Sequence, residues 1–207
     1  MRRCCLFALI STVAMLNPNI AVADTAVDAE PFSDATFILN VGRTGGWRFT
    51  VDAPLQLTHL GLYDWQADGF EGSYPIGVWD QGGTLLSSAI MPSGSDAELI
   101  NGFRYVEAPE GGVIFTPGQT YTIGYFASAI FPNDHALHEP GWHAFNPLVH
   151  QVGTAVATNG AFPGLTMPTV QFTENWLGPS FQFTVVPSPA SWLTLGVFAL
   201  RGFRRRR

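Results

Sequence analysis

The sequence contains no lysine, and this absence limits the partners that the protein can have. All ten basic residues are arginines, and seven of them lie in the first three and last seven residues. Between residues 24 and 186, only Arg43, Arg48 and Arg104 stand against all sixteen acidic residues, a formal charge of −13. So acidic a surface repels phosphate backbones. We therefore expect no nucleic acid among the partners.

Cysteine is almost as scarce. The two cysteines, Cys4 and Cys5, precede an apolar run at the N-terminus and would leave with a cleaved signal peptide. The remaining segment would then have neither a disulfide nor thiol chemistry. The sequence also lacks the Gly-x-Ser-x-Gly motif and a phosphate-binding loop. We predict that the protein is not an enzyme, and we assign no catalytic residue.

No apolar run reaches the roughly 20 residues of a membrane-spanning helix. The N-terminus instead has two arginines, an apolar stretch over residues 4–16, and the small residues Ala21 and Ala23. This layout is typical of a secretory signal peptide. We place cleavage after Ala23, so that residues 1–23 are removed. The protein is then exported, with the Sec translocon as its first partner.

The C-terminus has a second three-part layout. A Pro/Ser-rich segment, Val186–Ser191, is followed by the apolar stretch Trp192–Leu200 and by four terminal arginines, Arg204–Arg207. A basic cluster beside an apolar segment stays on the cytoplasmic side of a membrane. In an exported chain, this predicts transient association with the inner membrane. An ordinary tail anchor is the alternative.

This order of segments resembles the PEP-CTERM sorting signal of Gram-negative bacterial proteins. The resemblance implies that an exosortase, a membrane cysteine protease, recognises and cuts the tail at 187–207. The glutamate that usually stands between the two prolines is Ser188 here. The residues assigned to the sorting signal are Val186, Pro187, Ser188, Pro189, Arg204, Arg205, Arg206 and Arg207.

Between the two ends, apolar residues alternate with a period of two. In Tyr74–Ala89, Ile76 and Val78 alternate with other residues, and Asp80–Gly83 ends in two glycines, which predicts a β-hairpin. Other strands are expected at 35–41, 47–51, 55–63, 99–106, 113–115, 121–125 and 180–186, the last with Phe181, Phe183 and Val185 facing inward.

One of these strands changes parity along its length. Its apolar positions move from Leu55 and Leu57 to Leu60 and Leu62. A β-bulge near Thr58–His59 would restore a single inward face.

These patterns predict an all-β fold, an antiparallel β-sandwich of jelly-roll type with about eight or nine strands. An N-terminal signal helix and a short C-terminal apolar helix would flank it. We expect a flexible lead-in over 24–34, a sandwich over 35–186, and a sorting tail at 187–207. Within the sandwich, residues 128–175 are rich in proline and histidine and read as a long irregular excursion with short strands near 152–157 and 169–172.

Several short motifs in this core resemble a domain family of unknown function found in bacterial exported proteins. The resemblance implies a role at the cell surface or in the matrix, and it offers no catalytic residues. The matching segments are Gly46–Phe49, Leu60–Tyr63, Gly77–Asp80, Gly83–Leu86, Gly102–Val106, Pro117–Tyr121 and Gly178–Phe183.

Two kinds of metal site are conceivable. Asp64, Asp68, Glu71 and Asp80 could donate oxygens to calcium, although Asp is also an ordinary turn residue. The nitrogens of His135, His138 and His143 could bind a transition metal, although loop histidines are commonly solvated.

Two tryptophans are candidates for contact with glycans, because sugar rings stack on exposed aromatic faces. These are Trp65 and Trp142, which lie in expected loops. Large aromatics also close the ends of sandwich cores. We therefore expect an exported, non-enzymatic protein of the cell surface, envelope or extracellular matrix, with exopolysaccharide as a conceivable partner. A carbohydrate-binding, lectin-like or glycan-processing module is the alternative.

Overall fold

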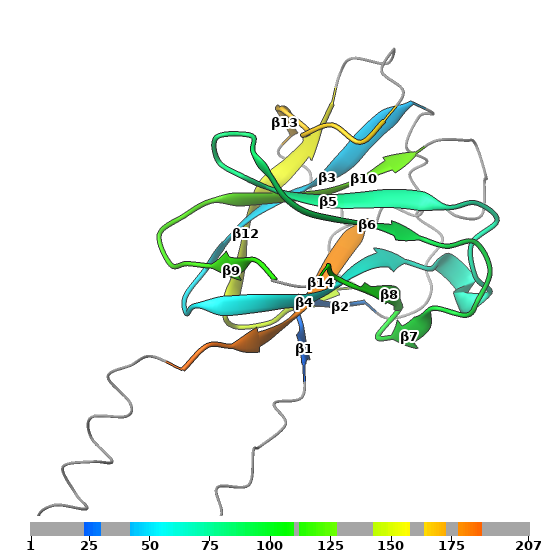
Figure 1. Cartoon of the computed structure of the whole chain (residues 1–207), viewed down its shortest axis with the longest axis horizontal. Helices are drawn as coiled ribbons and strands as arrows, with labels where there is room; N and C mark the ends of the chain where they lie inside the picture. Colours follow the sequence, from blue (N-terminus) through cyan, green and yellow to red (C-terminus); the bar gives the residue numbers. More distant parts are fainter. Residues whose placement is uncertain are drawn as a thin grey trace, which may run out of the picture.

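The computed structural model describes residues 23–29, 42–109, 112–127, 143–157, 164–172 and 178–187 (Figure 1). Within these ranges the chain forms fourteen strands, all in antiparallel sheets, and the predicted all-β class is confirmed. One helical turn is present there, the 3-10 helix η1 (Trp65–Ala67). In the same ranges, no helix has the length and apolar character needed to cross a membrane. The expected flanking helices fall on residues 1–22 and 188–207, outside the described residues.

The first sheet has six strands. Its order is β1 (Asp24–Thr25), β14 (Pro179–Val185), β4 (Leu55–Tyr63), β8 (Phe103–Glu107) and β7 (Glu98–Ile100), and β9 (Ile114–Phe115) also pairs with β4.

The second sheet also has six strands, and a two-stranded sheet accompanies it. The order is β13 (Val170–Phe172), β12 (Val149–Val156), β3 (Arg43–Val51), β10 (Tyr121–Ala127), β5 (Tyr74–Asp80) and β6 (Leu85–Met91). The small sheet pairs β2 (Val27–Ala29) with β11 (His143–Phe145).

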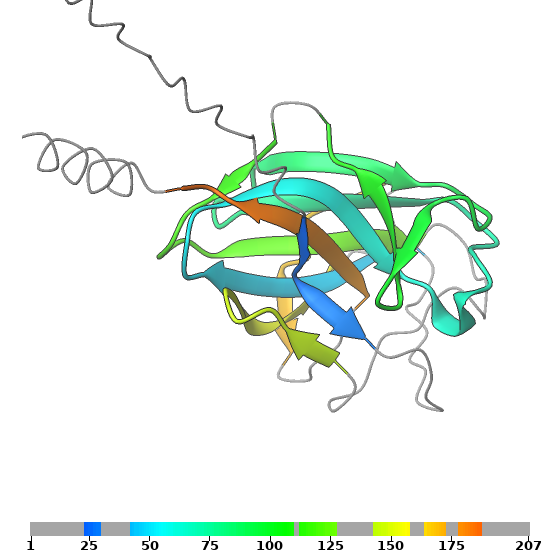
Figure 2. The ribbon, with the colours of Figure 1, turned by 90° about the horizontal axis from the view of Figure 1, so that it is seen from below.

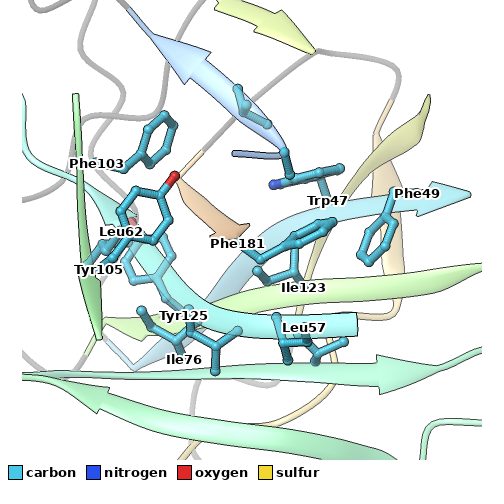
Figure 3. Close-up of a cluster of buried hydrophobic side chains, with 14 of the residues drawn as sticks. Trp47, Phe49, Leu57, Leu62, Ile76, Phe103, Tyr105, Ile123, Tyr125 and Phe181 are labelled. Carbon is cyan, nitrogen blue, oxygen red and sulfur yellow. The ribbon is translucent and has the colours of Figure 1, made fainter. Parts of the chain in front are cut away.

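Aromatic side chains from both large sheets meet in one core (Figure 3). The ring centroid of Phe181 on β14 lies 4.8 Å from that of Phe49 and 6.1 Å from that of Trp47, both on β3. The indole N–H of Trp47 donates a hydrogen bond of 2.7 Å to the carbonyl of Pro179. Each such buried aromatic contributes about 1.5–3 kcal/mol by leaving water. These contacts join the two sheets in one core.

The parity change in β4 arises from the predicted bulge. His59 pairs with Gln182 of β14, and Leu57 pairs with the next residue, Phe183, so Thr58 has no opposite residue. The extra residue rotates the rest of the strand by one position. Leu57 and Leu60 are consequently both buried on the core side.

The expected hairpin is confirmed as the pair β5–β6. Tyr74 pairs with Met91 at one end and Trp79 with Leu85 at the other. At the turn, the side chain of Asp80 accepts a hydrogen bond of 2.8 Å from the N–H of Thr84. Gly83 has a φ of 87°, a left-handed conformation that favours glycine.

The strand expected at 99–106 is in fact two strands, β7 and β8. Asn101 and Gly102 form the turn between them with φ values of 49° and 83°. Two successive left-handed residues are what a two-residue hairpin requires, and Asn-Gly adopts them readily. The interpretation of 99–106 as one strand was therefore wrong, because it passed over this turn signal.

Two further expectations need correction. The lead-in over 24–34 contains β1 and β2, and the N–H of Ala26 donates to the carbonyl of Phe181, so residues 24–29 are part of the fold. The excursion over 128–175 contains β12, an interior strand of the second sheet, together with β11 and β13. The short strands expected near 152–157 and 169–172 are confirmed. Val185 is 46% exposed and is not part of the buried core that was expected to include it.

Residues 164–168 cover part of the outer face of the second sheet. The N–H of Thr166 donates to the hydroxyl of Thr44 on β3 at 3.2 Å. A Cβ added at Gly77 would lie 2.7 Å from the Cδ2 of Leu165, so Leu165 packs closely over this glycine. Trp79, beside Gly77 on β5, is 3% exposed. The outer face therefore has a small apolar layer of its own.

The pairing of β1 with β14 fixes where the chain enters and leaves the fold. Asp24 pairs with Phe183 and Thr25 with Gln182, in antiparallel register. Residues 23 and 186 therefore leave the described domain at the same end, as Figures 1 and 2 show for β1 and the end of β14. We call this the proximal end, and the opposite end the distal end.

We predict that Phe181→Ala lowers the free energy of unfolding by about 3–5 kcal/mol, because it removes the ring that contacts both Trp47 and Phe49. Val185→Ala on the same strand, at an exposed position, should cost no more than about 0.5 kcal/mol. Urea unfolding of both variants measures the difference. Equal losses would contradict the assigned core.

Candidate functional site at the distal loops

Two loops at the distal end, residues 64–73 and 92–97, are held together by one arginine. We call them the distal loops. The Nε of Arg104 lies 2.6 Å from the Oδ2 of Asp64, and the two side chains are 6% and 1% exposed. The distal end of the core is thus closed by a buried ion pair.

The remaining nitrogens of Arg104 donate to backbone carbonyls of both loops. Nη1 donates to Ser95 at 2.6 Å and to Ala97 at 2.8 Å, and Nη2 donates to Ala67 at 3.2 Å. The planar guanidinium can make these bonds at once because its donors point in fixed directions. Arg104 therefore acts as a staple between the distal loops.

The strand register explains why this arginine points to the core side. Arg104 pairs with Leu62, whose side chain is buried in the core. Phe103 and Tyr105 alternate with Arg104 and so lie on the opposite face of β8. On that face, the hydroxyl of Tyr105 donates to Ser180 at 3.2 Å.

Further contacts close the loops. The carboxylate of Asp64 accepts a hydrogen bond of 3.1 Å from the N–H of Gly69. Phe70 and Gly94 exchange backbone hydrogen bonds of 3.2 and 2.7 Å between the two loops. Phe70 is 3% exposed and packs edge-on against Tyr74. The distal loops therefore form one ordered platform.

The backbone beside Trp65 is strained. Gln66 and Ala67 have φ values of 74° and 61°, which residues with a side chain adopt at a cost of the order of 1 kcal/mol or more each. The bond from Arg104 to the carbonyl of Ala67 offsets part of this cost. The local conformation thus depends on a residue far along the chain.

Burial raises the pKa of the Asp64 carboxyl above its ordinary value of 3.8, while the hydrogen bond and charge of Arg104 and the N–H of Gly69 oppose the shift. For the Asp64 carboxylate, the cost of desolvation therefore outweighs the attraction of Arg104. The ion pair fixes the arrangement of the distal loops more than it adds to the net stability of the fold. Because the folded pKa lies above the unfolded one, the stability linked to this group is present below pH 3.8 and is lost as pH rises through the folded pKa.

The predicted four-carboxylate calcium site is not formed. Asp64 is committed to Arg104, whereas Asp68 and Glu71 are exposed on the distal loops. Asp80 lies at the proximal end of β5, about 20 Å from its distal end at 3.3 Å per residue, and accepts the N–H of Thr84. Among the residues with assigned positions, no three His, Cys, Asp or Glu side chains gather as a metal site.

The other predicted site residues are placed only in part. Trp65 is half-buried and packs against the core, which leaves only part of its ring for a ligand. His143 lies on β11, with its ring 5.2 Å from that of Phe145. His135, His138 and Trp142 fall outside the described residues.

The signal residues lie at the boundary of the fold. Ala23 is the first described residue, and Val186 donates its N–H to the carbonyl of Pro54 at 2.9 Å. Pro187 is the last described residue. Outside the described residues are Ala21, Ser188, Pro189, Arg204, Arg205, Arg206 and Arg207.

Comparison of the chain with protein-family models found no match, and comparison with curated proteins found none. The structure alone establishes the fold class of the described residues, which is an all-β architecture of antiparallel sheets around a shared aromatic core.

Sequence reasoning gave no role to Arg104, which organises the distal end. It counted this residue among the three arginines of residues 24–186 and included it in the Gly102–Val106 motif. One signal was available: Arg104 is one of only three arginines in a segment with sixteen acidic residues, and it alternates with two aromatics in a strand. An isolated cation in such a strand points to a buried partner.

We predict that Arg104→Met lowers the free energy of unfolding by about 3–5 kcal/mol, because it leaves the Asp64 carboxylate buried without its counter-charge. Arg48→Met, at a half-buried position on β3, should cost no more than about 1 kcal/mol. Thermal or urea unfolding compares the two variants. A similar small loss in both would show that the staple is dispensable.

Proposed function

We propose that the protein is an exported, non-enzymatic β-sandwich of jelly-roll type that serves at the cell surface or in the extracellular matrix. Its N-terminal signal directs export, and its PEP-CTERM-like tail directs sorting. The observation that supports the proposal is the pairing of β1 with β14, which brings the start of β1 and the end of β14 to the proximal end of the described domain.

This geometry suits a domain handled at a membrane. The tail begins directly after β14, where Val186 is held to the carbonyl of Pro54. A tail that pauses in the inner membrane would hold the proximal end toward the membrane. The distal loops, with their exposed Asp68, Glu71 and Asp96, would then face away from it.

The partners that follow from this proposal are the Sec translocon and an exosortase-type protease. The association with the inner membrane is transient, and the mature domain resides in the envelope, at the outer surface or outside the cell. Exopolysaccharide is the matrix component with which such a domain would associate. The excess of carboxylates makes nucleic acid an unsuitable partner.

A second candidate function is glycan binding by a lectin-like or glycan-processing module. Trp65 favours it, because this half-buried ring stands beside the exposed side chains of Gln66 and Asp68 on an ordered platform. A glycan array separates the two functions. Binding that falls about tenfold in Trp65→Ala, but not in Leu99→Ala, would favour the second.

We predict that mass spectrometry of the native protein finds a mature form that begins at Asp24 and lacks Arg204–Arg207. Replacement of all four terminal arginines by glutamine should leave an uncut form that no longer collects in the inner-membrane fraction, because the cytoplasmic anchor charge is lost. Arg48→Gln is the matched control and should be processed normally. A mature protein that still ends at Arg207 would refute the sorting proposal.

A further inference from the structure

Strand β6 forms an edge of the second sheet. It pairs with β5 on one side, and no other strand in the described ranges pairs with its second side. An edge strand presents backbone N–H and C=O groups that can pair with another chain.

The register shows which backbone groups face outward. The N–H of Asp80 donates to the carbonyl of Thr84, so alternate residues of β5 back to Ile76 direct their backbone groups to β6, and Pro75, which has no N–H, directs its own away. The pairing of Pro75 with Ile90 is therefore of the kind without hydrogen bonds. The pairs alternate along an antiparallel ladder, so the pairing of Gly77 with Ser88 is of the same kind. The N–H and C=O groups of Ser88 and Ile90 therefore point away from β5, toward the open edge.

This edge carries none of the charges that commonly protect edge strands. Residues 81–95 contain no charged residue, whereas residues 24–186 carry a formal charge of −13. Leu85 is 48% exposed and Ile90 is 66% exposed. Two copies of so acidic a domain would repel each other least where they approach through an uncharged strand.

A groove runs beside the proximal half of β6. Its volume is about 340 Å³, and it is lined by Leu85, Ser88 and their neighbours on one side and by Pro109, Gly112 and Val113 on the other. Its walls are apolar side chains and serine hydroxyls. Alternate side chains of an added strand would enter it while the backbone pairs with β6.

We propose that β6 pairs antiparallel with β6 of a second copy of the chain, centred on Ser88. Among the antiparallel registers, this one lets all seven residues of the strand pair: Leu85 lies opposite Met91, and Leu86 lies opposite Ile90. Apolar residues then meet apolar residues in these two pairs, Ser87 lies opposite Ala89, and Ser88 meets itself on the two-fold axis. The contact is self-complementary, as a two-fold dimer requires.

The direction of β6 gives this dimer a particular shape. The strand starts at Leu85, near the proximal end, and runs to Met91, near the distal end, because Tyr74 and Met91 pair at the distal end of β5. Antiparallel pairing turns the second copy around, so the two proximal ends point in opposite directions. This step rests on the proposed surface function. If each proximal end faces a surface, the dimer would bridge two opposed surfaces and would not join two copies on the same surface.

Cysteine cross-linking of the full chain tests the pairing. In a Cys4→Ser, Cys5→Ser background, Ser88→Cys places two thiols across the two-fold axis. Opposite Cα atoms in such a pair are about 5.5 Å apart, within disulfide range. We expect a disulfide-linked dimer that forms at least about tenfold faster than with Val152→Cys, an exposed position on β12. Equal rates at the two positions would overturn the proposal.

A second variant separates pairing from chance collision. Ile90→Lys in the Ser88→Cys chain adds a charge to the edge at a position that is 66% exposed, so the urea midpoint should stay unchanged. Cross-linking should fall about tenfold, because the lysine would lie against Leu86 of the other copy. Undiminished cross-linking would contradict the register.

The bridging step has its own readout. Beads that carry the full chain, attached through the C-terminus, should cluster, and beads that carry Ile90→Lys should stay dispersed. Cross-linking in solution without clustering would uphold the β6 pairing and count against the surface presentation on which bridging rests. Failure of cross-linking would remove the pairing and leave the proposed export and sorting untouched.

Discussion

The packing of Phe181 on β14 against Trp47 and Phe49 on β3 is the contact on which the rest of the domain depends. It joins the two sheets. The hydrogen bond from Trp47 to Pro179, the first residue of β14, fixes the position of this strand along its own axis. Because β14 is fixed, its partner β1 has a fixed place too. The positions at which the chain enters and leaves the described domain follow from this buried aromatic contact.

The distal end is organised on another principle. There the core is closed by the ion pair of Arg104 and Asp64, whose burial costs desolvation that their attraction only partly returns. What the pair provides is a single arrangement of the distal loops, including the strained backbone of Gln66 and Ala67. The packed aromatic core and the stapled distal loops together hold the described domain in one arrangement.

Alternation along the chain was sufficient to predict the all-β class, the β5–β6 hairpin and the bulge at Thr58, because each depends on neighbours in sequence. Polarity misled at residues 24–29, because β1 is held by pairing with β14 and β2 by pairing with β11, rather than by their own pattern. The Asp64–Arg104 pair joins residues 40 positions apart, so no local pattern revealed it. Local patterns also do not show distances in space. Asp64 and Asp80 were therefore expected to be neighbours, although the length of β5 lies between them.

The central claim is that the chain enters and leaves the fold at one end. Spin labels at Asp24→Cys and Val185→Cys measure this most directly, because Asp24 pairs with Phe183, two residues from Val185. The account predicts a separation of about 10–20 Å between these labels, including the label arms, and a clearly longer one between Asp24→Cys and Ser95→Cys in the distal loops. A distance above about 30 Å between the first pair would contradict it.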